Sequence, residues 1–273
     1  MPELPEVEVT KRGITPALLN KKISKIYFSD KSLREPFSSD LYNLEGGYIQ
    51  SIQRRGKYII LVSDKGYVLI HLGMSGHLHV TDENEPIKKH DHFEIQTSEG
   101  VIVRLNDTRR FGLVKYYSLD NPPFENSPLK ELGPEPLTEL FNSDYLFEKL
   151  KKYKKDIKQT IMDNKVVVGV GNIYASEVLF ISRIHPEKKA NTLSKEQCAV
   201  LTQNIKDVLS KAILQGGTTI RDFEGADGKL GYFVQSLMVY GHDGEKCKEC
   251  GHIIEKITQG QRSTYFCPYC QKL

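Results

Sequence analysis

The sequence predicts an α+β protein: an N-terminal helix on an antiparallel β-sandwich, then a helical domain, then a four-cysteine zinc ribbon. Three observations favour this class. Apolar residues recur with a strand-like period of about two as far as Tyr117, and with a helical period of about 3.6 after residue 137. A proline-rich segment, 119–137, separates the two regions. Two Cys-x-x-Cys pairs lie close to the C-terminus.

A helix is expected directly behind the N-terminus, over residues 3–20. Glu3 and Glu6 lie in its first turn, where carboxylates favour the positive end of the helix dipole. Pro16 is expected to bend or interrupt this helix because proline lacks the backbone N–H. Strands follow, separated by short turns that contain glycine and favour hairpins. They are predicted at 23–27, 58–62, 67–70, 92–95 and 101–105.

Beyond the proline-rich linker the spacing is helical. Helices are predicted at 145–150, 157–162, 173–181 and 194–214. Segment 166–172 places two glycines and an asparagine immediately before one of them, where free backbone N–H groups can bind phosphate, although an ordinary packing turn is the alternative. Segment 216–233 is rich in glycine and polar residues, which indicates a loop. The predicted domains are 1–118, a linker at 119–137, a helical domain at 138–237 and a zinc finger at 238–273.

The cysteine spacing indicates one structural zinc ion. Sixteen residues separate the two pairs, which is the spacing of a tetrahedral site with four cysteine ligands, whereas disulfides or buried thiols would not require such regular pairs. The ligands are Cys247, Cys250, Cys267 and Cys270. The segment between the pairs carries a hairpin tip with Arg262, which the metal would hold in a fixed place. The fifth cysteine, Cys198, lies at helical spacing from Leu201 and Ile205 and is expected in the core.

Composition restricts the class of protein. With 39% hydrophobic and 27% charged residues, the chain of 273 residues is neither disordered nor a membrane protein, and it is long enough for two domains plus the zinc module. The acidic N-terminus has no apolar core, so it is not a signal peptide, and a cytoplasmic location is expected.

Clusters of basic residues favour nucleic acid as the partner. The net charge is only +3, but basic residues gather at 54–57, between Lys149 and Lys158, and around the zinc ribbon. One such cluster is usually a solvated surface. Three on one chain, one of them on a zinc ribbon, point to DNA or RNA.

Chemistry could come from the chain terminus. The sequence contains no Gly-x-Ser-x-Gly, Walker or His-Glu-x-x-His motif, which argues against the common hydrolases and nucleotide triphosphatases. Removal of Met1 would leave Pro2 with a secondary amine, and an α-amino group titrates near pH ~7.7–8. Such an amine can attack a sugar's aldehyde-level carbon to give an iminium, with Glu3 beside it as a proton shuttle. The alternative is a frayed end whose carboxylates only cap a helix.

The start of the chain, residues 1–8 (MPELPEVE), resembles that of bacterial formamidopyrimidine-DNA glycosylases. The similarity covers essentially the whole chain and includes separately specific motifs in the same order: HLGMSG at 71–76, KHDH at 89–92, DTRRFG at 107–112, MDNK at 162–165, GVGNIYASE at 169–177 and the four cysteines. The resemblance implies the same sandwich, helix-two-turn-helix domain and zinc finger.

The resemblance also implies roles for individual residues. Pro2 forms the Schiff base, Glu3 assists release of the base, and Lys57 and Arg262 serve β- and δ-elimination; Glu6 is grouped with them. Met74, Arg109 and Phe111 would fill the gap left by a flipped nucleotide. The expected DNA contacts are His71, His90, Arg109, Tyr153, Lys154, Lys158, Asn172 and Arg262. A lesion loop would include Thr218, Thr219, Gly231 and Tyr232. Where the family often has a run of lysines, this chain has Lys152-Tyr153-Lys154, which leaves open which of Tyr153 and Lys154 contacts DNA.

The implied function is base-excision DNA repair. A monomeric, bifunctional glycosylase and abasic-site lyase would remove oxidised purines such as 8-oxoguanine and formamidopyrimidines from double-stranded DNA, in a bacterial cytoplasm and associated with the nucleoid. Two alternatives remain. One is an endonuclease VIII-like enzyme for oxidised pyrimidines, whose N-terminus usually departs at Leu4. The other is a non-catalytic zinc-ribbon protein that binds DNA or RNA.

Overall fold

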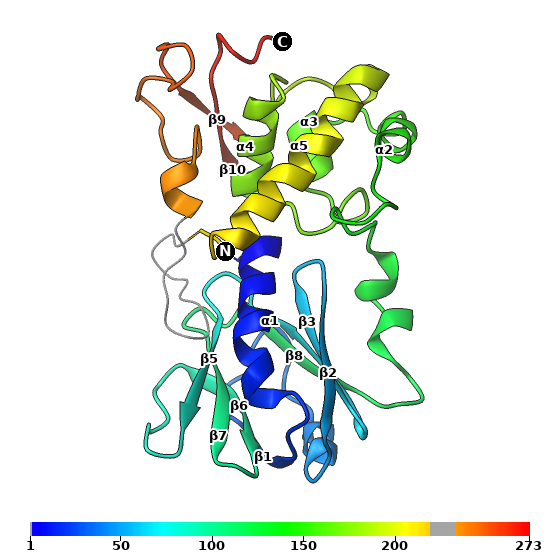
Figure 1. Cartoon of the computed structure of the whole chain (residues 1–273), viewed down its shortest axis with the longest axis vertical. Coiled ribbons are helices and arrows are strands. Elements are labelled where there is room, and N and C mark those ends of the chain that lie inside the picture. The colour runs from blue at the N-terminus through cyan, green and yellow to red at the C-terminus, as the bar shows by residue number, and fades with distance from the viewer. Residues whose placement is uncertain (1, 219–232) are drawn as a thin grey trace. The chain divides into compact units, whose positions relative to one another are not determined.

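The computed structural model describes residues 2–218 and 233–273, which form two compact units (Figure 1). The first contains residues 2–131 together with 215–218, and the second contains 132–214 together with 233–273. The domain boundaries that the sequence predicts, at 1–118, 119–137, 138–237 and 238–273, stay predictions.

Helix α1 (Leu4–Leu18) opens the first unit and buries Val7, Ile14 and Leu18. Its start is fixed by a capping box, in which Glu3 and Glu6 each accept a hydrogen bond from the other's backbone N–H. The expectation that Pro16 interrupts this helix was wrong: the helix continues through it to Leu18. Pro16 lies in the last turn, so its missing N–H affects only the helix end.

Two four-stranded antiparallel sheets form the sandwich. The first has the order β1 (Ile23–Phe28), β6 (Asp91–Thr97), β7 (Val101–Asn106), β5 (His77–Asp82). The second has the order β2 (Ile49–Arg55), β3 (Tyr58–Ser63), β4 (Gly66–His71), β8 (Leu113–Tyr117). Short 3-10 helices are η1 (Ser39–Leu44), η2 (Pro123–Glu125) and η3 (Leu129–Glu131). Helix α1 contacts strands of both sheets, and one apolar core joins the three layers.

The five predicted strands are present, and β2, β5 and β8 were missed. Strand β2 has only two apolar residues, Ile49 and Ile52, and a register shift between Ile49 and Ser51 breaks their alternation. Strand β5 is an edge strand that also has only two, Leu78 and Val80. Two apolar residues form too short a pattern to indicate a strand.

The second unit is helical around one apolar core. Its helices are α2 (Ser143–Leu150), α3 (Ile157–Ile161), α4 (Asn172–Ile181) and α5 (Lys195–Leu214), with 3-10 helices η4 (Ala190–Thr192) and η5 (Phe233–Ser236). Cys198 is fully buried in that core, which confirms its predicted place, and burial raises the pKa of its thiol to about 11.

Strands β9 (Glu255–Gln259) and β10 (Arg262–Phe266) form the ribbon. Gly260 and Gln261 have φ values of 53° and 63°, as a two-residue hairpin turn requires. The ribbon's apolar cluster is small and includes Phe180 of α4. The buried Glu177 carboxylate of α4 accepts backbone N–H groups from residues 238–240, which attaches the start of the ribbon to that helix.

Within the described ranges, no helix has the length and apolar character to cross a membrane.

Candidate active site and nucleic-acid interface

The N-terminus is held by the carboxylate of Glu6. One of its oxygens accepts the Glu3 N–H at 2.8 Å. The other accepts the backbone N–H of Thr218 at 2.8 Å and its hydroxyl at 2.9 Å. Pro2 and Glu3 are buried. Because chain ends normally fray, these bonds give the first residues a fixed position that a reactive amine needs.

Lys57 lies in the tight turn between β2 and β3. Arg54 supports this turn from one side, since its guanidinium donates to the carbonyl of Gly56 at 3.1 Å and to the carboxylate of Glu8 at 2.9 Å. Burial raises the pKa of Glu8, but hydrogen bonds from Lys11, Arg54 and Arg12 outweigh it, so the pKa lies below its usual value. An ionised Glu8 therefore links α1 to the turn that carries Lys57.

His71, at the end of β4, is a neutral imidazole. Burial and the nearby charges of Arg34 and Lys57 lower its pKa to about 3. Its Nδ1 accepts the Gly73 N–H at 3.0 Å. With Nδ1 as the acceptor, the proton is on Nε2, and the ring can offer one N–H to a phosphate without carrying charge.

The three predicted void-filling residues lie together on two turns of the first unit. Met74 is 40% and Phe111 45% exposed, so neither is in the core. The Arg109 guanidinium lies 4.9 Å from the centre of the Phe111 ring. Exposed large apolar side chains beside a cation suit insertion between bases. His90 is adjacent, because its carbonyl accepts the N–H of Asp107 in the second of these turns.

In the second unit, Lys158 and Asn172 hold the ribbon hairpin. Lys158 is only 1% exposed, and its ammonium donates to Asn172 Oδ1 at 2.6 Å, Thr264 Oγ1 at 2.6 Å and the Ser263 carbonyl at 3.1 Å. Asn172 donates to the same carbonyl at 2.9 Å. These contacts fix the residue next to Arg262, whereas a direct phosphate contact by Lys158 stays a prediction.

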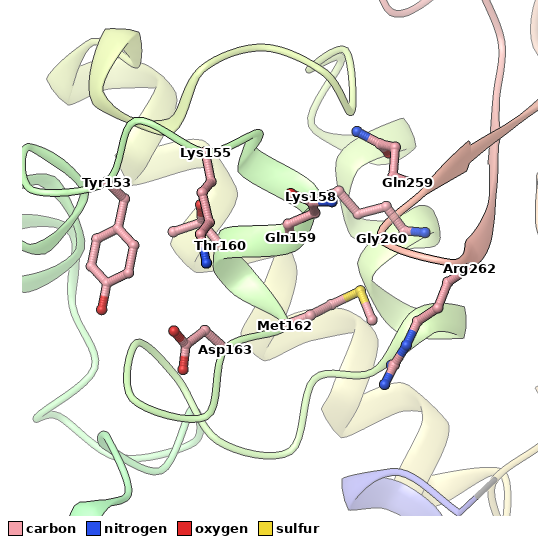
Figure 2. A pocket seen from close by; sticks show the side chains of 10 residues that line it. All are labelled: Tyr153, Lys155, Lys158, Gln159, Thr160, Met162, Asp163, Gln259, Gly260 and Arg262. Carbon is pink, nitrogen blue, oxygen red and sulfur yellow. The ribbon is translucent and has the colours of Figure 1, made fainter.

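A pocket of about 380 Å³ lies beside this hairpin (Figure 2). Arg262 borders it on one side, and Tyr153 and Lys155 lie on the other. Asp163 is the one acidic residue among its lining residues. Its lining is Tyr153, Lys155, Lys158, Gln159, Thr160, Met162, Asp163, Gln259, Gly260 and Arg262. A concave surface with several cations is suited to an anionic backbone.

Tyr153 and Lys154, the two candidates for one DNA contact, differ in their exposure. Tyr153 is half-buried and packs against the core of the second unit, and burial raises its pKa. Lys154 is exposed.

Segment 166–172 is mostly buried, with Asn172 as its more exposed end. Of the lesion loop, Thr218 is described above, while Thr219, Gly231 and Tyr232 lie outside the described residues.

The four cysteines fit one zinc ion. Their sulfur atoms all lie within 4.8 Å of one another. The Cys250–Cys267 and Cys247–Cys270 sulfur separations are 3.5 and 4.0 Å, too long for disulfides. A tetrahedral ion with Zn–S bonds of about 2.3 Å fits this arrangement. Four protein ligands close the coordination sphere, so the ion is structural rather than catalytic.

Sequence reasoning missed the supporting residues Glu8, Arg54 and Glu177. Glu8 and Arg12 have the i,i+4 spacing of a helical ion pair, which was a usable signal. Arg54 was visible only as part of a basic cluster. Glu177 acts through backbone groups that lie distant in sequence, and sequence alone does not reveal such partners.

Three family models match the chain. Residues 1–114 match the formamidopyrimidine-DNA glycosylase N-terminal domain, 132–224 match its H2TH domain, and 244–273 match a zinc finger found in FPG and IleRS. A formamidopyrimidine-DNA glycosylase of Vibrio vulnificus is 51% identical over 271 residues, which are 99% of this chain and 100% of the relative.

Solved structures agree with these matches. A Lactococcus lactis FPG mutant in complex with Fapy-dG DNA is 37% identical with a TM-score of 0.92, and the match covers 100% of both chains. MutM in complex with DNA containing carbocyclic 8-oxo-G is 39% identical with a TM-score of 0.90, again over 100% of both chains.

Removal of zinc should unfold the ribbon and lower DNA affinity together. The small apolar cluster cannot replace four metal bonds, so metal binding and local folding are one event. The expected result on chelation is loss of backbone order at 244–273 by hydrogen exchange, with weaker binding of lesion DNA. Demetallated protein that retained both order and binding would show that the metal has no structural part.

Proposed function

The chain belongs to the formamidopyrimidine-DNA glycosylase family, and on that premise we propose how its own residues excise oxidised purines from double-stranded DNA. It is a bifunctional enzyme of base-excision repair, a DNA glycosylase with abasic-site lyase activity and one structural zinc ion. The observation that carries the proposal is the buried, hydrogen-bonded chain start, in which Glu6 fixes the backbone next to Pro2.

In the proposed reaction, removal of Met1 exposes the secondary amine of Pro2, which attacks C1′ of the damaged nucleotide. The C1′–N bond to the base breaks as Glu3 supplies a proton to the departing base, and the Pro2 nitrogen releases its own proton. The C1′–O4′ bond of the sugar ring then opens, O4′ takes up a proton, and an iminium links Pro2 to C1′. The iminium withdraws electrons, so loss of a C2′ proton expels the 3′ phosphate, and a second elimination expels the 5′ phosphate. Lys57 and Arg262 serve these eliminations. Glu6, with both oxygens accepting hydrogen bonds, positions the amine.

DNA is distorted and held by the residues around these groups. Met74 and Phe111 enter the space that the damaged nucleotide leaves, and Arg109 pairs with the orphaned base. His71 donates its Nε2–H to phosphate, and His90, Asn172 and Arg262 contribute further contacts. The exposed Lys154 is a better direct contact than the half-buried Tyr153, and Lys158 acts through the hairpin that it holds.

Recognition of the damaged base is proposed for the segment around Thr218, Thr219, Gly231 and Tyr232. Thr218 is tied to Glu6, which connects this segment to the chain start. The enzyme is expected to act as a monomer in the bacterial cytoplasm, associated with the nucleoid through DNA.

Borohydride trapping tests the nucleophile. Reduction of the iminium should join protein and DNA containing an abasic or oxidised site, with the adduct on Pro2. Protein that retains Met1 is the matched control and should give no adduct, because its Pro2 nitrogen is an amide. A non-catalytic DNA-binding protein would give no adduct in either form, and an adduct on Lys57 would overturn the assignment to Pro2.

Replacing Arg262 should separate the two chemical steps. A cation that stabilises the leaving phosphate contributes ~2.7–4 kcal/mol to the barrier when it acts like one oxyanion donor. At saturating protein, Arg262→Ala should slow strand cleavage by about 100-fold or more and slow base release less. The control is Lys256→Ala, on the neighbouring strand β9. Within the described residues, the only ion pair that this substitution removes is the exposed one between Lys256 and Asp243. Wild-type nicking by Arg262→Ala would make Arg262 a phosphate anchor alone.

A further inference from the structure

The turns that carry the void-filling residues touch each other. One joins β4 to β5 and holds Gly73 and Met74, and the other joins β7 to β8 and holds Arg109 and Phe111. Gly73 has a φ of 67°, and a Cβ on it would approach the Gly112 nitrogen to 2.5 Å. Only glycine permits this approach, so the two backbones are packed together without side chains between them.

A single buried carboxylate binds both turns. Asp107 is fully buried; its Oδ1 accepts the Ser75 hydroxyl at 2.7 Å, and its Oδ2 accepts the Gly112 N–H at 2.8 Å. The Ser75 oxygen in turn accepts the Arg109 N–H at 3.1 Å. Ser75 follows Met74 directly, and Gly112 follows Phe111. Met74 and Phe111 are therefore each followed by a residue that is hydrogen-bonded to Asp107, and Arg109 is connected to Asp107 through the Ser75 hydroxyl.

Arg34 makes a second link on the outer side. Its guanidinium donates to the Phe111 carbonyl at 2.8 Å and lies 3.4 Å from His71 Nδ1, the atom that also accepts the Gly73 N–H. Arg34 comes from a loop outside both turns, so it restrains them from a separate part of the chain. This link requires the neutral imidazole, because a protonated Nδ1 would repel the guanidinium.

From these contacts we infer that Asp107 and Ser75 are positioning residues, which fix Met74, Arg109 and Phe111 as one preassembled wedge. This deepens the proposed function and rests on it. Insertion between bases must offset the cost of unstacking them. A wedge whose backbone is already ordered loses no conformational entropy when it inserts. More of the free energy of its contacts with DNA is then left to offset the cost of unstacking.

Ser75→Ala tests the inference, because it breaks the bridge between the turns and leaves Asp107 bound to Gly112. Two substrates are compared: a duplex with one 8-oxoguanine, whose excision needs the wedge, and a single strand with an abasic site, which has no stacked gap to fill. Ser75→Ala should excise 8-oxoguanine from the duplex about 10-fold more slowly, which is the effect expected from loss of a hydrogen bond to a charged group. It should cleave the single strand at the wild-type rate. Ser24→Ala, which removes an exposed hydroxyl of β1, should match the wild type on both.

A double-mutant cycle separates positioning from general structure. In a Met74→Ala background, Ser75→Ala should add less than about a two-fold further loss, because its effect runs through the wedge. Asp107→Asn, which keeps the shape but loses one acceptor, should repeat the pattern across the two substrates. The inference is overturned if the duplex rate of Ser75→Ala is unchanged, if both substrates slow equally, or if the effects of Ser75 and Met74 multiply independently. Wild-type protein that cleaved neither substrate would instead remove the proposed function, and the inference with it.

Discussion

The structure depends on one constraint: the reacting amine is proposed to be the end of the chain, and chain ends are the least ordered part of a protein. The Glu6 carboxylate meets this constraint with hydrogen bonds to the Glu3 N–H and to Thr218. It lies in the first turn of α1, where the helix dipole favours negative charge. The helix in turn packs on both sheets, so the sandwich core stabilises the position of the terminal residue.

The same device recurs at three turns that carry or adjoin a residue of proposed function. Buried or half-buried polar side chains hold the backbone beside it: Arg54 with Glu8 beside Lys57, Asp107 beside Phe111, and Lys158 with Asn172 beside Arg262. A turn has too few apolar residues to be fixed by packing, and satisfied hydrogen bonds in a low-dielectric surrounding supply the missing restraint. The zinc ion does the same on a larger scale for the ribbon.

Local patterns in the sequence predicted much of this architecture. The cysteine spacing predicted the metal cluster, and the change of period predicted a sandwich followed by helices. Strands β2 and β5 were missed because each has only two apolar residues, which form too short a pattern to indicate a strand. Pro16 was judged without knowing that it lies in the last turn of α1. The residue types of the proposed site came from the motifs. The contacts of Lys158 with Asn172, of Asp107 with Ser75 and of Glu6 with Thr218 span 14, 32 and 212 positions, and no local pattern encodes them.

The most direct test of this account measures how fast Glu6→Gln forms a borohydride-trapped adduct on duplex DNA that already contains an abasic site. Glutamine has one acceptor oxygen, so either the Glu3 N–H or Thr218 loses its partner. The abasic substrate makes release of the base unnecessary, and Glu3→Gln serves as the comparison that should still trap. The account predicts that Glu6→Gln traps at least about 10-fold more slowly than the wild type at saturating protein, in line with loss of a hydrogen bond to a charged group. Trapping by Glu6→Gln at the wild-type rate would contradict the claim that this carboxylate holds the reacting amine in place.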